Sequence, residues 1–353
     1  MAKKIFKITI SILAAILILA AGYVAFMIVT DYKPEEKISL DVKNNKSETL
    51  NTKNEIKITT FNIGYGTMDE SVDFFMDGGV MSRGISKEKT LENMDAIIKV
   101  LKDLNSDLMF LQEVDLKATR SYKVNELQII KDEFKDYSSN FAINYKVPWV
   151  PIPLYRPHGN VLSGLLTLSK YDITSATRYD LPGKSSFFMQ LGDLDRAMTV
   201  NRMPVDNGKE LVAVNAHLSA YDKGGTVRKI QLGYIKQFLE AEYAKGNYVI
   251  IGGDWNQQIP GTNAFDFPTT EEWPEWLQDV PEDLTPANFT WAYDKTVPSD
   301  RTVAKSYTPG ENLLSVIDGF LVSDNIEIIS TVGSDLAFKN SDHNPVTITF
   351  KLK

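Results

Sequence analysis

The chain has 353 residues, a net charge of −8 at pH 7 and no cysteine. Without cysteine, disulfides, thiolate zinc sites, cysteine nucleophiles and a lipoprotein anchor on cysteine are all excluded. The acidic balance argues against a dedicated nucleic-acid binder, which usually carries a basic face, although a local basic patch can exist within an acidic total. Hydrophobic residues make up 43% of the chain, which is enough for a large buried core.

The N-terminal segment contains a run without charge at residues 8–29. About 20 apolar residues in a helix cross a hydrocarbon core of about 30 Å. Lysines precede the run and acidic residues follow it, so the N-terminus is expected in the cytoplasm and the rest of the chain outside. A cleaved signal peptide is the alternative, because small residues occur at 20–22. The apolar run continues past them, which favours an uncleaved single-pass anchor in the cell membrane.

Composition divides the chain into three parts. Residues 1–30 are predicted to form a cytoplasmic stub and transmembrane anchor. Residues 31–55 are polar, rich in Lys, Asn and Glu and poor in aromatic residues, which predicts a flexible linker that buries no core. Residues 56–353 are predicted to form one folded domain, because about 300 residues suit a single large core.

Secondary-structure signals alternate along this domain. Apolar spacing predicts, in chain order, a strand at 56–61, a helix at 87–104, a strand at 108–111, a helix at 125–134, strands at 163–168, 197–205 and 211–214, a helix at 226–245, and strands at 248–251, 317–322 and 346–350. Asn207-Gly208 is typical of a hairpin turn. Hairpins mixed with helical crossovers favour mixed sheets. We therefore expect an α/β (α+β) fold: a four-layer sandwich of two packed mixed β-sheets flanked by helices, preceded by a transmembrane helix.

Polar residues occur where the predicted strands end or shortly after them. Strand ends are where a sheet can aim polar side chains into one cleft. Carboxylates, amides and imidazoles gathered there suit a hard divalent cation and a phosphate. The residues are Asn62, Glu113, His217, Asp254, Asn256, Asp318, Asp342 and His343.

Two of these carboxylates follow apolar runs directly. Glu113 and Asp254 would each lie at the end of a buried strand, where desolvation is costly unless a cation or hydrogen-bond donors meet the charge. A helix cap or a structural ion pair is the alternative for either one alone. Asp318 lies within an apolar strand and needs a partner. The natural partner is His343, whose tautomer it would hold, although Asp318 could instead cap the backbone.

Four further residues are candidate substrate contacts. His158 and Asn160 belong to a glycine-containing loop, and Arg196 and Arg301 are possible phosphate clamps. Residues 265–293 are dense in aromatic side chains. This segment could form a substrate rim or a membrane-facing loop, or could simply pack internally.

With these motifs the chain resembles the endonuclease/exonuclease/phosphatase superfamily, the deoxyribonuclease I-like fold, as a membrane-anchored bacterial member. The motifs are FNIG, FLQEVD, VNAHL, GGDWN and SDHNP, in this order, and the resemblance covers residues 56–353. It implies cleavage of a phosphoester that depends on Mg²⁺ or Mn²⁺. By position, Glu113 would be the main metal ligand, with Asn62 and Asp342 supporting the metal or its waters.

The resemblance also implies roles for the remaining motif residues. Asp254 would orient or deprotonate the attacking water, and Asn256 would bind the phosphate. His343, held by Asp318, and His217 would stabilise the pentavalent phosphate or assist the leaving oxygen. The chain has no clear match to the catalytic tyrosine of the apurinic endonuclease branch. Its lack of cysteine disfavours the inositol-phosphatase branch.

The sequence leaves the substrate open. One hypothesis is a phosphodiesterase tethered to the outer membrane face that acts on phospholipid headgroups or small phosphodiesters. The alternative is a surface-anchored nuclease that degrades extracellular DNA or RNA. A non-catalytic binding module would require a broken site, whereas every site position carries its expected residue. The membrane is an expected partner through the N-terminal helix, and no obligate protein partner is evident.

Overall fold

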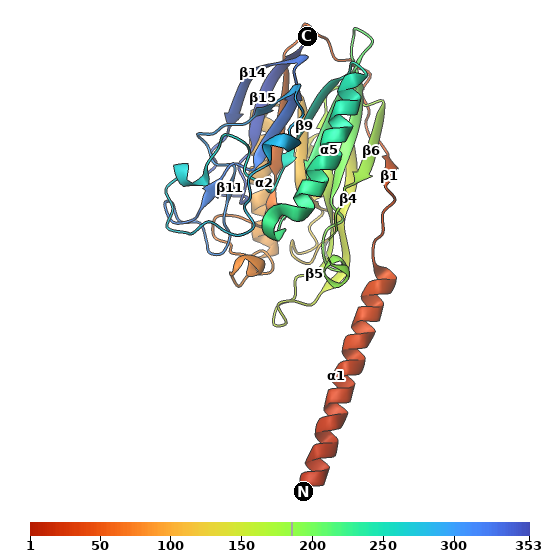
Figure 1. Cartoon of the computed structure of the whole chain (residues 1–353), viewed down its shortest axis with the longest axis vertical. Coiled ribbons are helices and arrows are strands. Elements are labelled where there is room, and N and C mark those ends of the chain that lie inside the picture. The colour runs from red at the N-terminus through yellow and green to blue at the C-terminus, as the bar shows by residue number, and fades with distance from the viewer. Residues whose placement is uncertain (185) are drawn as a thin grey trace.

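Two β-sheets packed face to face form the body of the molecule (Figure 1). The computed structural model describes residues 1–184 and 186–353. Helices cover the outer faces of the two sheets, and a long N-terminal helix extends away from them (Figure 1). The predicted sandwich of two mixed sheets flanked by helices is confirmed.

The first sheet has seven strands, in the order β1-β6-β7-β8-β9-β13-β10. Only β8 and β9 are parallel neighbours, and the other pairs in this sheet are antiparallel. The strands are β1 (Lys37–Leu40), β6 (Ser175–Asp180), β7 (Ala197–Pro204), β8 (Glu210–His217), β9 (Tyr248–Asp254), β10 (Phe289–Ala292) and β13 (Asp318–Ser323).

The second sheet has six strands, in the order β14-β15-β2-β3-β5-β4. Here only β2 and β3 are parallel. The strands are β2 (Ile56–Asn62), β3 (Leu108–Asp115), β4 (Ser138–Val150), β5 (Gly159–Ser169), β14 (Ile326–Gly333) and β15 (Val346–Leu352), and a separate pair is formed by β11 (Asp300–Arg301) and β12 (Leu314–Ser315).

Helices connect the parallel strands, because such strands need a crossover. Helix α2 lies between β2 and β3, and α5 lies between β8 and β9. The α-helices are α1 (Ala2–Thr30), α2 (Lys87–Leu104), α3 (Glu126–Glu133), α4 (Phe187–Gln190) and α5 (Thr226–Ala244), and the 3₁₀ helices are η1 (Gly64–Gly66), η2 (Phe75–Asp77), η3 (Lys223–Gly225), η4 (Ala264–Asp266) and η5 (Glu282–Leu284).

The main core lies between the sheets. Phe110 of β3 and Phe320 of β13 meet there with ring centroids 6.5 Å apart. On the outer faces, α2 packs Met94 and Ile97 against the second sheet, and α5 packs Leu239 against the first. Helix α2 begins where its periodicity predicts, because the Oγ of Ser86 accepts a hydrogen bond from the Lys89 N–H.

Residues 31–55 differ from the predicted flexible linker. Residues 37–40 form β1, which pairs with β6, and Leu50 pairs with Val205 and is completely buried in the core between the sheets. The polar composition gave no sign of this attachment, because it depends mainly on backbone hydrogen bonds and on a few apolar side chains, Leu50 with Leu40 and Val42. The folded domain therefore begins near Lys37 rather than at Ile56.

Besides β1 and the two-residue strands β11 and β12, the sequence did not predict β4, β6, β10 and β14. Three of them, β4, β10 and β14, are edge strands, and β6 is covered only by the short β1. An edge strand of a sandwich buries one face at most, so its sequence lacks the continuous apolar run that marks a central strand.

Helix α1 has 29 residues and is long and apolar enough to cross a membrane. Its last turns contact the folded domain. Met27 is buried beside Tyr145 and Leu191, and the Tyr23 hydroxyl donates a hydrogen bond of 3.0 Å to the Trp149 carbonyl. The helix therefore joins the domain through side-chain contacts as well as through the chain itself.

Replacement of Leu50 by alanine tests the corrected domain boundary. Leu50→Ala removes a completely buried side chain and should lower the free energy of unfolding by about 2–5 kcal/mol. The matched control is Lys53→Ala, which alters an exposed residue nearby and should change stability by less than about 0.5 kcal/mol. Denaturant unfolding of the detergent-solubilised chain measures both. Equal free energies of unfolding for the two variants would show that Leu50 does not contribute to the core and that residues 31–55 are a linker.

Candidate active site

The C-terminal ends of the parallel strands bring the predicted site residues together. Asn62 ends β2 and pairs in register with Gln112 of β3, next to Glu113. In the other sheet His217 ends β8 and pairs with Asp254 at the end of β9. Asp254 also pairs with Asp318, the first residue of β13. Because the two sheets face each other, these ends meet at one edge of the sandwich.

The backbone bends at Glu113. This residue has a left-handed φ of 56°, and the register with β5 shifts between Leu111 and Val114. Such a bulge turns one side chain out of the regular alternation of a strand. A non-glycine residue in this region of φ is strained, and strain of this kind clusters at functional sites. The bulge places Glu113 in the wall of the cavity described below.

Close packing fixes the two glycines before Asp254. At Gly253, where φ is 156°, a Cβ atom would lie 1.8 Å from the Ala216 carbonyl oxygen. At Gly252 a Cβ atom would lie 2.3 Å from the Phe320 ring. Only glycine therefore allows β9 to approach β8 and β13 closely enough to bring Asp254 beside both neighbours.

The Asp254 carboxylate is the most heavily contacted group of the site. Its Oδ1 accepts the backbone N–H of Asn256 at 2.8 Å, and its Oδ2 accepts the Asn62 amide at 3.0 Å. The Nε2 atoms of His217 and His343 lie 3.3 and 3.9 Å from Oδ2. Burial opposes ionisation, but these imidazoles and hydrogen bonds outweigh it and lower the pKa of Asp254.

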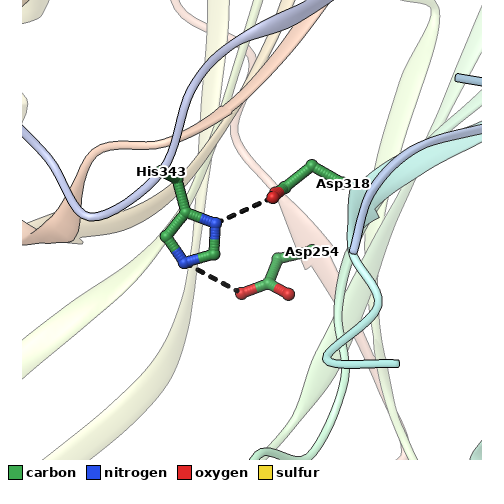
Figure 2. Close-up of side chains that lie close together, drawn as sticks. All are labelled: Asp254, Asp318 and His343. Atoms are coloured by element: carbon green, nitrogen blue, oxygen red, sulfur yellow. Dashed lines mark hydrogen bonds and ion pairs between the residues drawn. The ribbon is translucent and has the colours of Figure 1, made fainter. Parts of the chain in front are cut away.

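His343 lies between two aspartates (Figure 2). Its Nδ1 is 2.8 Å from Oδ2 of Asp318, while its Nε2 faces Asp254. Burial disfavours the imidazolium, yet Asp318 and Asp254 together raise the pKa of His343 well above its usual value. This shift favours the imidazolium form of His343, and the 2.8 Å contact between its Nδ1 and Asp318 is the predicted pairing.

The second imidazole is in the opposite state. Burial, together with the nearby Arg196 guanidinium, lowers the pKa of His217 to about 3. His217 is therefore neutral at pH 7, and Asp254 has one neutral and one charged imidazole beside it. Two titratable groups whose pKa values are pushed apart are the arrangement expected of acid and base assignments.

Glu113 carries few strong contacts. Its Oε1 lies 3.5 Å from the Asn62 amide, and its Oε2 lies 3.6 Å from Nη1 of Arg120. Burial raises the pKa of Glu113, and Arg120 only partly opposes this. A carboxylate that is half-buried, weakly partnered and turned toward a cavity can accept a cation. Asp342 lies in the same wall, with its Oδ1 3.4 Å from the Ser341 hydroxyl.

The residues present fit a hard divalent cation. Asp254, Asp318 and His343 offer ligand atoms within 4.8 Å of one another. However, Asp318 and His343 already satisfy each other at 2.8 Å. The weakly partnered carboxylates of Glu113 and Asp342 are therefore the better ligands, and all-oxygen donors of this type suit Mg²⁺ or Mn²⁺.

A cavity of about 850 Å³ contains most of the predicted site residues. Asn62 and Asp318 do not line the cavity themselves. Asn62 is hydrogen-bonded to Asp254, and Asp318 is hydrogen-bonded to His343. The predicted residues that line the cavity are Glu113, His158, Arg196, His217, Asp254, Asn256, Arg301, Asp342 and His343.

The four predicted substrate contacts have different surroundings. His158 is buried in the cavity wall, with its Nδ1 2.7 Å from the Ser82 carbonyl, and burial lowers its pKa to about 3. Arg196 also lines the cavity, and its buried Nη1 has no protein partner among the described residues. Nη2 of Arg301, in contrast, donates to the carbonyls of Asp69 and Val72, which braces a loop. Asn160 binds Thr119 and the Lys117 carbonyl instead.

Sequence reasoning missed three residues of the site. Arg120 lies with its guanidinium 3.6 Å from the centre of the Tyr65 ring and holds Asp115 through two hydrogen bonds. Asp300 has its Oδ1 3.7 Å from Nε2 of His343. Asp115 follows the same apolar run as Glu113, and a buried carboxylate at this position could have predicted a basic partner such as Arg120. Asp300 follows no such run and gave no signal.

Fold and site together define a hydrolase of phosphoester bonds. The chain belongs to the Endonuclease/Exonuclease/phosphatase family, whose sequence profile matches residues 59–343. A comparison with curated proteins finds no match.

Solved structures share the fold at low sequence identity. An endonuclease/exonuclease/phosphatase from Beutenbergia cavernae DSM 12333 is 15% identical over 84% of this chain and 72% of its own, with a TM-score of 0.59. One from Bacteroides vulgatus is 18% identical over 85% of this chain and 100% of its own, with a TM-score of 0.53. The human Nocturnin catalytic domain with bound sulfate is 16% identical over 89% of this chain and 97% of its own, also with a TM-score of 0.53.

Replacement of Asp318 by asparagine tests the proton on His343. The Asp318 carboxylate stabilises the imidazolium, so its loss in Asp318→Asn should lower the pKa of His343. The chain has three histidines, and NMR titration of their labelled side chains measures the change. The control signal is that of His158, which contacts Ser82 and should titrate as before. An unchanged pKa of His343 would refute the pairing.

Proposed function

We propose that this protein is a divalent-metal-dependent phosphodiesterase tethered to the outer face of the membrane. The observation that carries the proposal is the meeting at one cavity of a weakly partnered Glu113, the Asp254 carboxylate and a His343 imidazole held by Asp318. A phosphodiester needs three functions there: neutralisation of its oxygens, an oriented water and a donor for the leaving oxygen.

Glu113 and Asp342 would hold the cation, and Asn62 would orient Glu113 through its amide. When bound, Mg²⁺ or Mn²⁺ would supply Lewis-acid neutralisation of the phosphoryl oxygens. Arg120 supports this arrangement, because it fixes Asp115 and lies near Glu113 without saturating its carboxylate.

Asp254 would orient the attacking water and accept its proton. Its lowered pKa keeps it ionised at neutral pH, and its fixed contacts with Asn62 and Asn256 prevent it from rotating away. As the water oxygen bonds to phosphorus, the bond from phosphorus to the leaving oxygen breaks. The leaving oxygen then needs a proton or a hydrogen bond.

His343 is the group able to supply that proton, because it is charged and held by Asp318. Neutral His217, Asn256 and Arg196 would donate hydrogen bonds to the phosphoryl oxygens. Arg196 suits this role because its Nη1 has no protein partner among the described residues. His158 would contact the part of the substrate farther from phosphorus. Arg301 would stabilise the cavity wall, because it donates a hydrogen bond to the Asp69 carbonyl in a neighbouring loop.

A surface-anchored nuclease that degrades extracellular DNA or RNA is the second candidate. The family assignment favours it, because endonucleases and exonucleases are part of the family's description. The net charge of −8 favours a smaller or lipid phosphodiester over a long polyanion.

Removal of either carboxylate should abolish turnover. Glu113→Gln and Asp254→Asn should each lower kcat/KM by at least about 10³-fold, because each removes a charge that acts on the transition state. The purified full-length chain in detergent is assayed on bis(p-nitrophenyl) phosphate with Mg²⁺ or Mn²⁺, and chelation by EDTA should stop the reaction.

Asp103→Asn is the matched control, since Asp103 is exposed on α2 and should leave turnover unchanged. Circular dichroism checks that each variant is folded. Activity of Glu113→Gln near that of Asp103→Asn, or activity that survives EDTA, would refute the proposal. Plasmid DNA cleaved in preference to the small diester would select the nuclease.

A further inference from the structure

Large apolar side chains are exposed on three loops at one end of the molecule. These loops surround η2, connect β4 to β5, and include α4, and Figure 1 shows them at the end where α1 leaves the sheets. We call their exposed side chains the apolar rim: Met76, Val80, Ile152, Leu154, Phe187 and Phe188. Their exposure ranges from 49% for Met76 to 85% for Leu154.

The apolar rim borders the mouth of the cavity. Met76, Ile152 and Phe188 line the same cavity as Glu113 and Asp254. Two of the loops are tied together, because the Tyr155 hydroxyl hydrogen-bonds to the Val80 carbonyl. A substrate that enters the cavity on this side therefore passes exposed apolar side chains before it reaches the carboxylates.

Helix α1 contributes to the wall of the cavity. Tyr23, Val24 and Met27 line it, and Met27 is 3% exposed. The last lysine before the apolar run is Lys7. At a rise of about 1.5 Å per residue, the 20 residues from Lys7 to Met27 span about 30 Å, the thickness of a hydrocarbon core. With Lys7 at the inner boundary, Met27 and the cavity wall lie at the outer one.

An exposed group of this kind needs a partner. Contiguous apolar patches on a soluble surface mark interaction sites, whereas single exposed residues are ordinary. The outer leaflet is the partner that fits this place, because α1, if it spans a membrane, puts a bilayer against this end of the molecule. The distant β14 also exposes Ile329 and Val332, but it lies toward the opposite end, near the C-terminus (Figure 1).

Most aromatic side chains of residues 265–293 are packed against the protein, although Phe265 is exposed. Trp273 and Trp276 pack against a cluster that contains Leu277 and Leu313, and Trp291 packs on Trp255 with ring centroids 4.7 Å apart. Internal packing, one of the alternatives for this segment, accounts for most of its aromatic side chains.

We propose that the apolar rim inserts into the outer leaflet and that the cavity takes the phosphoester headgroup of a membrane lipid directly from the bilayer. The inference rests on the proposed function, since the same carboxylates would cleave the headgroup. The apolar rim lowers the cost of extraction, because the lipid tails remain among apolar side chains while the phosphate moves toward Glu113 and Asp254.

Single cysteines test the insertion, because the natural chain has none. Leu154→Cys and Phe187→Cys are labelled with bimane in the full-length chain and reconstituted into phosphatidylcholine vesicles. Lipids brominated on their acyl chains should cause a large loss of fluorescence at both positions. Val332→Cys, on the distant β14, is the control and should retain its fluorescence. Equal quenching at all three positions, or none at 154 and 187, would overturn the membrane contact.

Hydrolysis in the same vesicles tests the substrate. Leu154→Glu should lower headgroup release from phosphatidylcholine and sphingomyelin about tenfold relative to Val332→Glu, because a charge replaces an apolar side chain that would insert into the leaflet. Both variants should cleave bis(p-nitrophenyl) phosphate equally, since Leu154 lies outside the cavity wall. Cleavage of the soluble diester without lipid hydrolysis would overturn the lipid substrate alone. Cleavage of neither would refute the proposed function itself.

Discussion

The buried charge of Asp254 is the constraint on which the site depends. A carboxylate removed from water is stable only where donors and cations surround it. Here the donors come from both sheets: Asn62 ends a strand of the second sheet, while His217 and the Asn256 backbone belong to the first. The site therefore exists only when the two sheets are packed together, and the fold and the chemistry are coupled through one side chain.

Strand direction explains why this convergence is possible. Each sheet contains one parallel pair with a helical crossover, and the parallel pairs end at the same edge of the sandwich. Antiparallel strands alone would alternate their ends between the two edges. Gly253 completes the arrangement, because no larger residue would let β9 lie so close to Ala216. The bulge at Glu113 then turns the remaining carboxylate into the cavity.

Helix α1 packs on the folded domain beside the cavity. The segment that follows α1 pairs into the first sheet, and Met27 packs against the domain. The contacts of α1 thus orient the domain as well as attach it. A linker of freely moving residues would leave the domain in any orientation relative to α1, whereas these contacts hold the cavity beside the end of the helix.

The sequence by itself determined the central strands, the three main helices and the family, because buried strands and amphipathic helices carry periodic apolar patterns and the motifs stand at their ends. It also indicated the pairing of Asp318 with His343, since a buried aspartate requires a partner. Only the tertiary structure decided the place of residues 31–55, the edge strands, and the roles of Asp300 and Arg120. Those features depend on backbone pairing and on contacts between distant segments, which leave no local pattern. The same holds for the apolar rim, whose side chains come from three separate loops and become one surface only when the chain is folded.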